Sequence, residues 1–131
     1  MKKKIAILGS TGSIGTSTLE IIKRDKKNFD VVLLSANNNY KKLIQQAKIF
    51  KTKNVLIRNI IYYEKIINEL RNTKTRVYAG NVSLNKIISG KLDYTMSGIV
   101  GVAGLQPTLD AIKISKTVII ANKESIICGW E

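Results

Sequence analysis

A glycine-rich turn follows a short apolar run near the start of the chain, and this pattern constrains the fold most. The apolar run covers residues 5–8, and glycines follow at positions 9, 12 and 15. Apolar side chains then recur at positions 14, 19 and 22, which is compatible with a helix. A strand, a turn and a helix in this order predict a phosphate-binding unit, because unpaired N–H groups and aligned peptide dipoles at a helix N-terminus favour an anion.

Each glycine of this turn has its own expected role. Gly9 lets the chain turn sharply off the strand, Gly12 leaves room for a pyrophosphate, and Gly15 lets the helix lie close to the sheet. The N–H groups of residues 11–14 are the main expected donors, and the serine and threonine hydroxyls of the turn add to them. The predicted cofactor-binding residues of the turn are Gly9, Ser10, Thr11, Gly12, Ser13, Ile14 and Gly15. A turn that serves packing alone is the alternative.

The end of the second predicted strand indicates which dinucleotide is bound. The strand covers residues 29–34, and Ala36 and three asparagines at 37–39 follow it without a carboxylate. In dinucleotide-binding sheets an Asp or Glu at this place binds the ribose 2′-hydroxyl of NAD, whereas its absence accommodates a 2′-phosphate. We therefore predict NADP, with Asn37, Asn38 and Asn39 as the cradle. The alternative is a loop whose asparagines merely tolerate the left-handed conformation.

The rest of the chain alternates between strand and helix patterns. Helices are expected at 13–24, 40–50, 60–71 and 81–88 and after Pro107, and further strands at 54–57, 75–79, 92–96 and 117–120. Such alternation predicts an α/β fold with a doubly wound parallel sheet of about six strands, a Rossmann-like NADP-binding domain. One domain over residues 1–131 accounts for the whole pattern.

Two later segments place small or polar residues at strand ends. Residues 98–104 contain three glycines after the fifth strand, and we expect Gly98 and Ile99 to approach a cofactor closely. Packing glycines are the alternative. Asn122, Lys123 and Glu124 follow the sixth strand, where a lysine suits a substrate phosphate. Alternatively, Asn122 caps a final helix and Glu124 favours its dipole.

The charge balance is strongly basic, with 22 lysine and arginine residues against 9 acidic ones and a net charge of +13. The basic residues are scattered over all predicted elements and are not interleaved with aromatic residues. We therefore interpret the charge as a solvated surface and do not predict nucleic-acid binding. A general positive field would still attract phosphorylated small molecules.

The lack of a recognisable targeting signal and the single cysteine favour the cytoplasm. No apolar run approaches the roughly 20 residues of a membrane span, and the N-terminal lysines are not followed by a signal-peptide pattern, so no membrane association is expected. Cys128 is the single cysteine, which agrees with a reducing compartment. The chain has no histidine, so a Cys-His pair is impossible, and we expect a buried structural thiol.

The chain resembles the 1-deoxy-D-xylulose 5-phosphate reductoisomerases in four segments. These are residues 9–15, 34–39, 98–109 and 121–125. Many reductases share the first segment, whereas the last two are specific. The resemblance implies the N-terminal, NADPH-binding part of an enzyme of the non-mevalonate isoprenoid pathway. That enzyme converts 1-deoxy-D-xylulose 5-phosphate to 2-C-methyl-D-erythritol 4-phosphate by isomerisation and reduction.

The resemblance also implies roles for individual positions. Residues 11–14 would hold the pyrophosphate, residues 37–39 the 2′-phosphate, and Lys123 the substrate. Asn122 and Glu124 would also contact NADPH. The predicted cofactor-binding residues outside the glycine turn are Ala36, Asn37, Asn38, Asn39, Gly98, Ile99, Asn122 and Glu124.

The family's enzymes are longer than this chain, and their acidic metal-binding motif, mobile loop and C-terminal helical domain lie beyond residue 125 of this sequence. We therefore expect part of an enzyme that binds NADPH without catalysing alone, and we assign it no catalytic or metal-binding residue. A divalent Mg or Mn ion and a homodimer are implied for the full-length enzyme.

Two alternatives remain at this stage. One is another NADP-dependent reductase of the dihydrodipicolinate or semialdehyde type, which would lack the segments at 98–109 and 121–125. The other is a nucleotide-binding module without catalysis.

Overall fold

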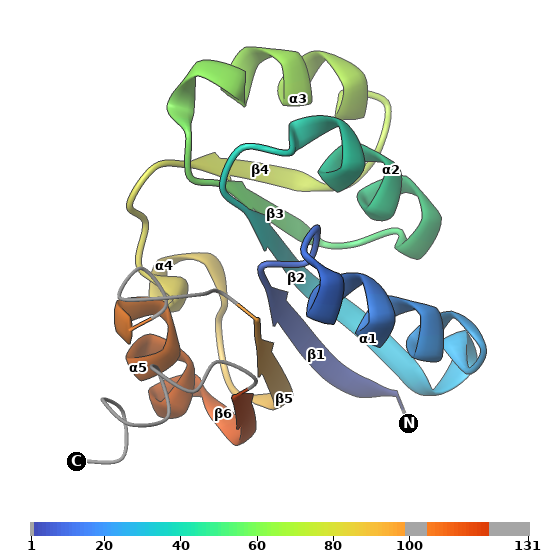
Figure 1. Cartoon of the computed structure of the whole chain (residues 1–131), viewed down its shortest axis with the longest axis vertical. Helices are drawn as coiled ribbons and strands as arrows, with labels where there is room; N and C mark the ends of the chain where they lie inside the picture. Colours follow the sequence, from blue (N-terminus) through green and yellow to red (C-terminus); the bar gives the residue numbers. More distant parts are fainter. Residues whose placement is uncertain (1, 99–104, 121–131) are drawn as a thin grey trace.

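A parallel sheet forms the centre of the computed structural model, which describes residues 2–98 and 105–120 (Figure 1). Six strands are hydrogen-bonded in the order β4-β3-β2-β1-β5-β6. Their bounds are β1 Lys3–Leu8, β2 Phe29–Ala36, β3 Asn54–Ile57, β4 Arg76–Ala79, β5 Leu92–Ser97 and β6 Ser115–Ile120. All five neighbouring pairs are parallel. The predicted doubly wound α/β fold is confirmed.

Helices cover both faces of this sheet. The α-helices are α1 Ser13–Lys23, α2 Tyr40–Phe50, α3 Tyr63–Leu70, α4 Leu84–Ile87 and α5 Leu105–Ile114, and two 3₁₀ turns are η1 Lys26–Asn28 and η2 Ile60–Tyr62. One hydrophobic core joins the sheet to α1, α2 and α3, and the other joins it to α4 and α5. Because both faces are covered, the central strands are apolar along nearly their whole length, as in β2, where six consecutive residues are buried.

The strand order reverses between β1 and β5. The chain runs outward from β1 through β2 and β3 to β4, and then returns to place β5 on the other side of β1. In open parallel sheets ligands bind outside the carboxyl ends of the strands at this switch point. We therefore expect a ligand site among the segments that follow β1, β2 and β5.

Most predicted element bounds agree with the structure. The helix expected at residues 81–88 is shorter and covers Leu84–Ile87, and two other bounds differ for identifiable reasons. The expected helix over residues 60–71 starts as the 3₁₀ turn η2, because the side chain of Asn59 accepts a hydrogen bond from Ile61 N and caps it there. Strand β6 starts at Ser115 instead of residue 117. Its buried Ser115 hydroxyl lies 2.6 Å from Thr95 Oγ1, a hydrogen bond that ties the start of β6 to β5.

None of the helices in the described part of the chain is both long enough and apolar enough to span a membrane.

Candidate functional site

The loop between β1 and α1 lies at the switch point, and its first residues are fixed to β2 (Figure 1). Gly9 has φ of +76°, a left-handed conformation that favours glycine. The N–H groups of Gly9 and Ser10 donate to Ser35 O at 3.0 and 2.8 Å. The predicted sharp turn at Gly9 is therefore present, and the end of β2 holds it in place.

Gly15 allows the start of α1 to lie directly on this turn. A Cβ atom at Gly15 would lie 2.5 Å from Ser10 Cα and would also collide with Gly9 O. Gly12 is different, because a Cβ there would lie 3.6 Å from Gly9 O, an ordinary contact. The close packing predicted for Gly15 is confirmed, whereas Gly12 has open space beside it.

The N-terminus of α1 presents unpaired donors. Gly12 is the residue before the helix and provides no side-chain cap. Within the described residues, the backbone N–H groups of Thr11, Ser13 and Ile14 have no hydrogen-bond acceptor. Free donors at the positive end of a helix dipole form a site for an anion such as a phosphate.

The Ser10 side chain differs from the expectation that the hydroxyls of the turn face a ligand. Ser10 is fully buried, and its hydroxyl donates to Gln46 Oε1 at 2.8 Å. In return, Gln46 Nε2 donates to Ser10 O at 2.9 Å. The physical reason is that a buried hydroxyl needs a hydrogen-bond partner, and Gln46 of α2 supplies one. The Ser10 hydroxyl thus stabilises the turn from inside.

Gly98 directly follows β5, on the other side of the switch point from β2. Its N–H donates to Leu8 O at 2.9 Å, which ties the end of β5 to the end of β1. A Cβ at Gly98 would lie 3.4 Å from the side chain of Ile14. Gly98 thus lies beside the first turn of α1, and Ile14 itself remains 43% exposed. The approach of Gly98 to a cofactor stays a prediction.

The three asparagines after β2 have different surroundings. Asn38 Oδ1 accepts a hydrogen bond from Asn59 Nδ2 at 2.8 Å, and Asn39 Oδ1 accepts one from Lys42 N and caps α2. The Asn37 side chain is exposed and has no hydrogen bond within the described residues. None of the three has positive φ, so the left-handed loop that was the alternative is not what these residues form.

Arg58 lies beside these asparagines, and sequence reasoning missed it. It directly follows β3, and its N–H donates to Ala36 O at 2.9 Å. Partial burial lowers the pKa of the Arg58 guanidinium below its usual range, and the charge of Asp110 offsets part of this effect. The signal in the sequence is a cation immediately after an apolar strand, and it becomes informative once β3 is known to pair with β2.

Several predicted residues lie outside the described part of the chain. They are Ile99, Asn122, Lys123 and Glu124. Within the described residues, no group of three or more potential ligands could hold a metal ion. The described site thus consists of the β1–α1 loop, the end of β2 with Arg58, and Gly98.

Comparison with known proteins identifies one family throughout. A family model described as 1-deoxy-D-xylulose 5-phosphate reductoisomerase matches residues 5–129. The chain is 55% identical to the curated protein of that name from Pelagibacter ubique, covering 98% of the chain and 34% of that protein. It is 42% identical to the one from Bacteroides fragilis, covering 99% of the chain and 34% of that protein. The chain thus spans about a third of the length of these relatives.

Solved structures agree with this result. The reductoisomerase from Zymomonas mobilis in complex with NADPH superposes with a TM-score of 0.90 at 38% identity, covering 97% of the chain and 34% of that structure's chain. A reductoisomerase in complex with NADPH, fosmidomycin and magnesium superposes with a TM-score of 0.86 at 31% identity, covering 95% and 31%.

Proposed function

Because the chain belongs to the 1-deoxy-D-xylulose 5-phosphate reductoisomerase family, we propose that it is the NADPH-binding part of such an enzyme. The whole enzyme would convert 1-deoxy-D-xylulose 5-phosphate to 2-C-methyl-D-erythritol 4-phosphate. NADPH supplies the hydride in this reaction, and the protein binds and orients it.

One observation carries the proposal. The free N–H groups of Thr11, Ser13 and Ile14 lie at the N-terminus of α1, at the point where the strand order reverses. The diphosphate of NADPH is the anion that fits them, because Gly12 leaves the approach open and Gly15 holds the helix against the turn. We assign this loop to the diphosphate.

The 2′-phosphate end would lie at β2 and β3. Asn37 offers an unengaged amide, and Arg58, whose backbone N–H donates to Ala36 O, offers a half-buried guanidinium. Arginine recognises phosphate through two parallel N–H donors. We propose that these two side chains select NADPH over NADH, while Asn38 and Asn39 keep the loop in shape through their own hydrogen bonds.

The remaining assignments rest on the family. Ile99, Asn122 and Glu124 would contact NADPH, and Lys123 would contact the phosphorylated substrate. The described residues do not fit a metal site, so no step of the mechanism is assigned to a metal here. A homodimer and a cytoplasmic location belong to the same proposal.

An activity comparison tests this function. NADPH oxidation in the presence of 1-deoxy-D-xylulose 5-phosphate and Mg²⁺ is measured for the 131-residue chain and for the same chain joined to the remaining two thirds of a relative such as the Pelagibacter ubique protein. We expect NADPH binding by both and turnover by the longer chain alone. Binding without turnover in either would favour a non-catalytic nucleotide-binding module instead.

A further inference from the structure

A hollow of about 300 Å³ lies at the amino ends of the strands, at the opposite end of the sheet from the β1–α1 loop. It lies where β1 to β4 begin, and the segment between α4 and β5 forms its remaining wall. Five of the residues that line it are basic: Lys4, Lys53, Lys74, Arg76 and Lys91. They come from the starts of three strands, β1, β3 and β4, and from the segment between α4 and β5, so the fold and not local sequence brings them together.

Backbone pairing fixes part of this arrangement. Arg76 N donates to Lys53 O at 2.9 Å, and Lys53 N donates to Val31 O at 3.4 Å. Asn54, which also lines the hollow, is buried and donates from Nδ2 to Val32 O at 3.0 Å. The wall that carries Lys53 and Arg76 is therefore held by hydrogen bonds and does not depend on flexible side chains.

The positive charge of the hollow is largely uncompensated. Lys53 Nζ pairs with Asp30 Oδ2 at 3.1 Å. Across residues 2–98 and 105–120, no ion pair involves the side chains of the other four basic residues. Asp93 is the other nearby acid, but its oxygens accept from Lys4 N and Lys116 Nζ. Like charges around a concave surface focus a field that attracts an anion.

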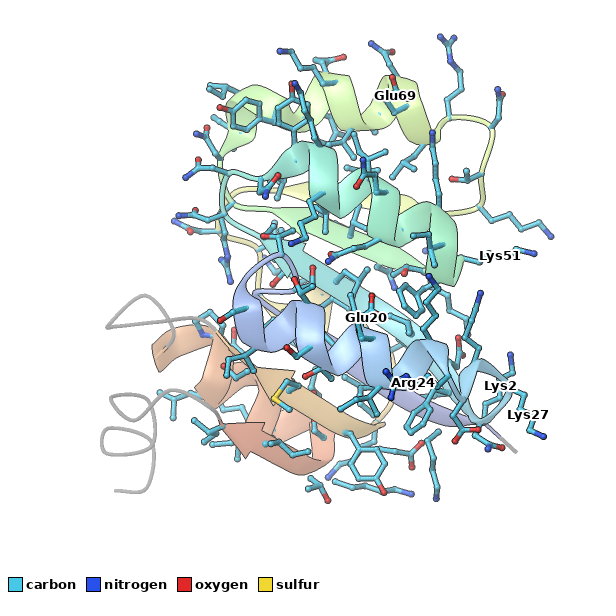
Figure 2. The ribbon with its side chains drawn as sticks, turned by 45° about the vertical axis from the view of Figure 1, so that its right-hand side comes forward. Lys2, Glu20, Arg24, Lys27, Lys51 and Glu69 are labelled. Carbon is cyan, nitrogen blue, oxygen red and sulfur yellow. The ribbon has the colours of Figure 1, made fainter. Side chains whose placement is uncertain are left out.

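Other exposed basic residues at this end of the molecule lie outside the hollow. Figure 2 shows Lys2, Arg24, Lys27 and Lys51 near the end of the molecule where β1 begins and α2 stops. None of them lines the hollow. They provide a comparison with the same charge in the same part of the molecule, but without a concave surface.

We propose that this basic hollow binds a small anion with two or more linked phosphate groups. Its volume lies at the lower end of the range for small-molecule pockets, which suits a diphosphate or triphosphate. Arg76 would supply a planar pair of donors, and the lysines would act as point charges. The site is separate from the β1–α1 loop, because the loop lies at the carboxyl ends of the strands and the hollow at their amino ends.

Calorimetric titration of the chain with inorganic diphosphate, at low and at physiological salt, tests the proposal. The variant Lys74→Gln/Arg76→Gln removes two charges from the hollow, and Lys2→Gln/Lys27→Gln removes two charges from the neighbouring surface. All four side chains are exposed, so both variants should fold, which circular dichroism checks. If the first fails to fold, Lys91→Gln replaces it.

We expect the hollow variant to weaken diphosphate binding about tenfold or more and the surface variant to leave it nearly unchanged. Because inorganic diphosphate can also enter the β1–α1 loop, the titration is repeated with saturating NADPH, and the binding that depends on Lys74 and Arg76 should persist. Equal losses in both variants, loss of the binding that depends on Lys74 and Arg76 when NADPH is present, or the absence of binding would overturn the proposal. Tighter binding of a DNA duplex that competes with diphosphate would also overturn it, in favour of a nucleic-acid surface. The comparison of the two variants does not depend on whether the β1–α1 loop binds NADPH.

Discussion

Gly15 and Ser10 are so close that a Cβ atom on Gly15 would lie 2.5 Å from Ser10 Cα. The obstructing atoms are backbone, so a side chain cannot turn aside to make room. The contact links the first turn of α1 to the turn that would hold the cofactor. Stability and binding therefore depend on the same loop, and substitutions at its glycines can separate the two.

Gly15→Ala should destabilise the fold strongly, because α1 would have to move away from the turn. We expect a loss of about 2 kcal/mol or more in the free energy of unfolding, measured by urea denaturation. A variant as stable as the original chain would show that the helix can shift at little cost.

Gly12→Ala is the matched substitution at an open position. The added Cβ meets Gly9 O at 3.6 Å, so the fold should lose about 1 kcal/mol or less, the usual cost of alanine at a helix N-cap. An added methyl group takes up room beside the loop that we assign to the diphosphate, so NADPH affinity should fall about tenfold or more. Unchanged affinity by NADPH fluorescence titration would count against the assigned position of the diphosphate.

Gln46→Leu should destabilise the glycine turn from inside. The Ser10 hydroxyl and carbonyl would both lose a buried partner, which costs about 1–3 kcal/mol. Ser10→Ala in the same chain removes the hydroxyl, whose remaining partner would be Ser35 O at 3.4 Å, so the double variant should lose less stability than the two single variants added together. Additive losses in urea denaturation would show that the two side chains do not act as a pair.

Arg58→Gln should weaken binding of NADPH more than binding of NADH. We assign the guanidinium to the 2′-phosphate, which NADH lacks, so its loss should raise the Kd for NADPH about tenfold. Lys113→Gln is the control, since it removes the same charge from an exposed position on α5. Equal losses for both nucleotides would assign Arg58 a general electrostatic or structural effect.

Asp93 should contribute to stability in a pH-dependent way. The N–H of Lys4 and, to a smaller extent, the ammonium of Lys116 lower the pKa of Asp93 below 3.8. A lowered pKa means that the folded state favours the carboxylate, so this contribution is present above pH 3.8 and is lost as the pH falls through the folded-state pKa.

Asp93→Asn tests that dependence. Urea denaturation between neutral pH and pH 3 should show a stability difference from the original chain that is constant at neutral pH and shrinks below about pH 4. A difference that does not change with pH would show that Asp93 stabilises β1 through its shape and not its charge.

The order of strands and helices could be predicted because each element carries its own local pattern. The α2 helix and β3 strand match their expected bounds, since apolar spacing marks both and polar residues separate them. The glycine turn was also predictable, because a glycine directly after a strand permits the positive φ that Gly9 adopts.

The tertiary partners could not be predicted in this way. Gln46 is a polar residue in a helix, and nothing near it in the sequence indicates that it is buried against Ser10, 36 positions away. Arg58 likewise acquires its place beside Ala36 through the pairing of β3 with β2. Contacts of this kind depend on strand order, which local patterns do not encode.

Amide chemical shifts in a ¹⁵N-labelled sample titrated with NADPH test the central assignment most directly, because they report on each backbone N–H separately. We predict that the largest shifts occur at Thr11, Ser13 and Ile14, with a second group at residues 37–39 and Arg58. Unchanged amides at the start of α1, with shifts confined to other parts of the sheet, would contradict the account.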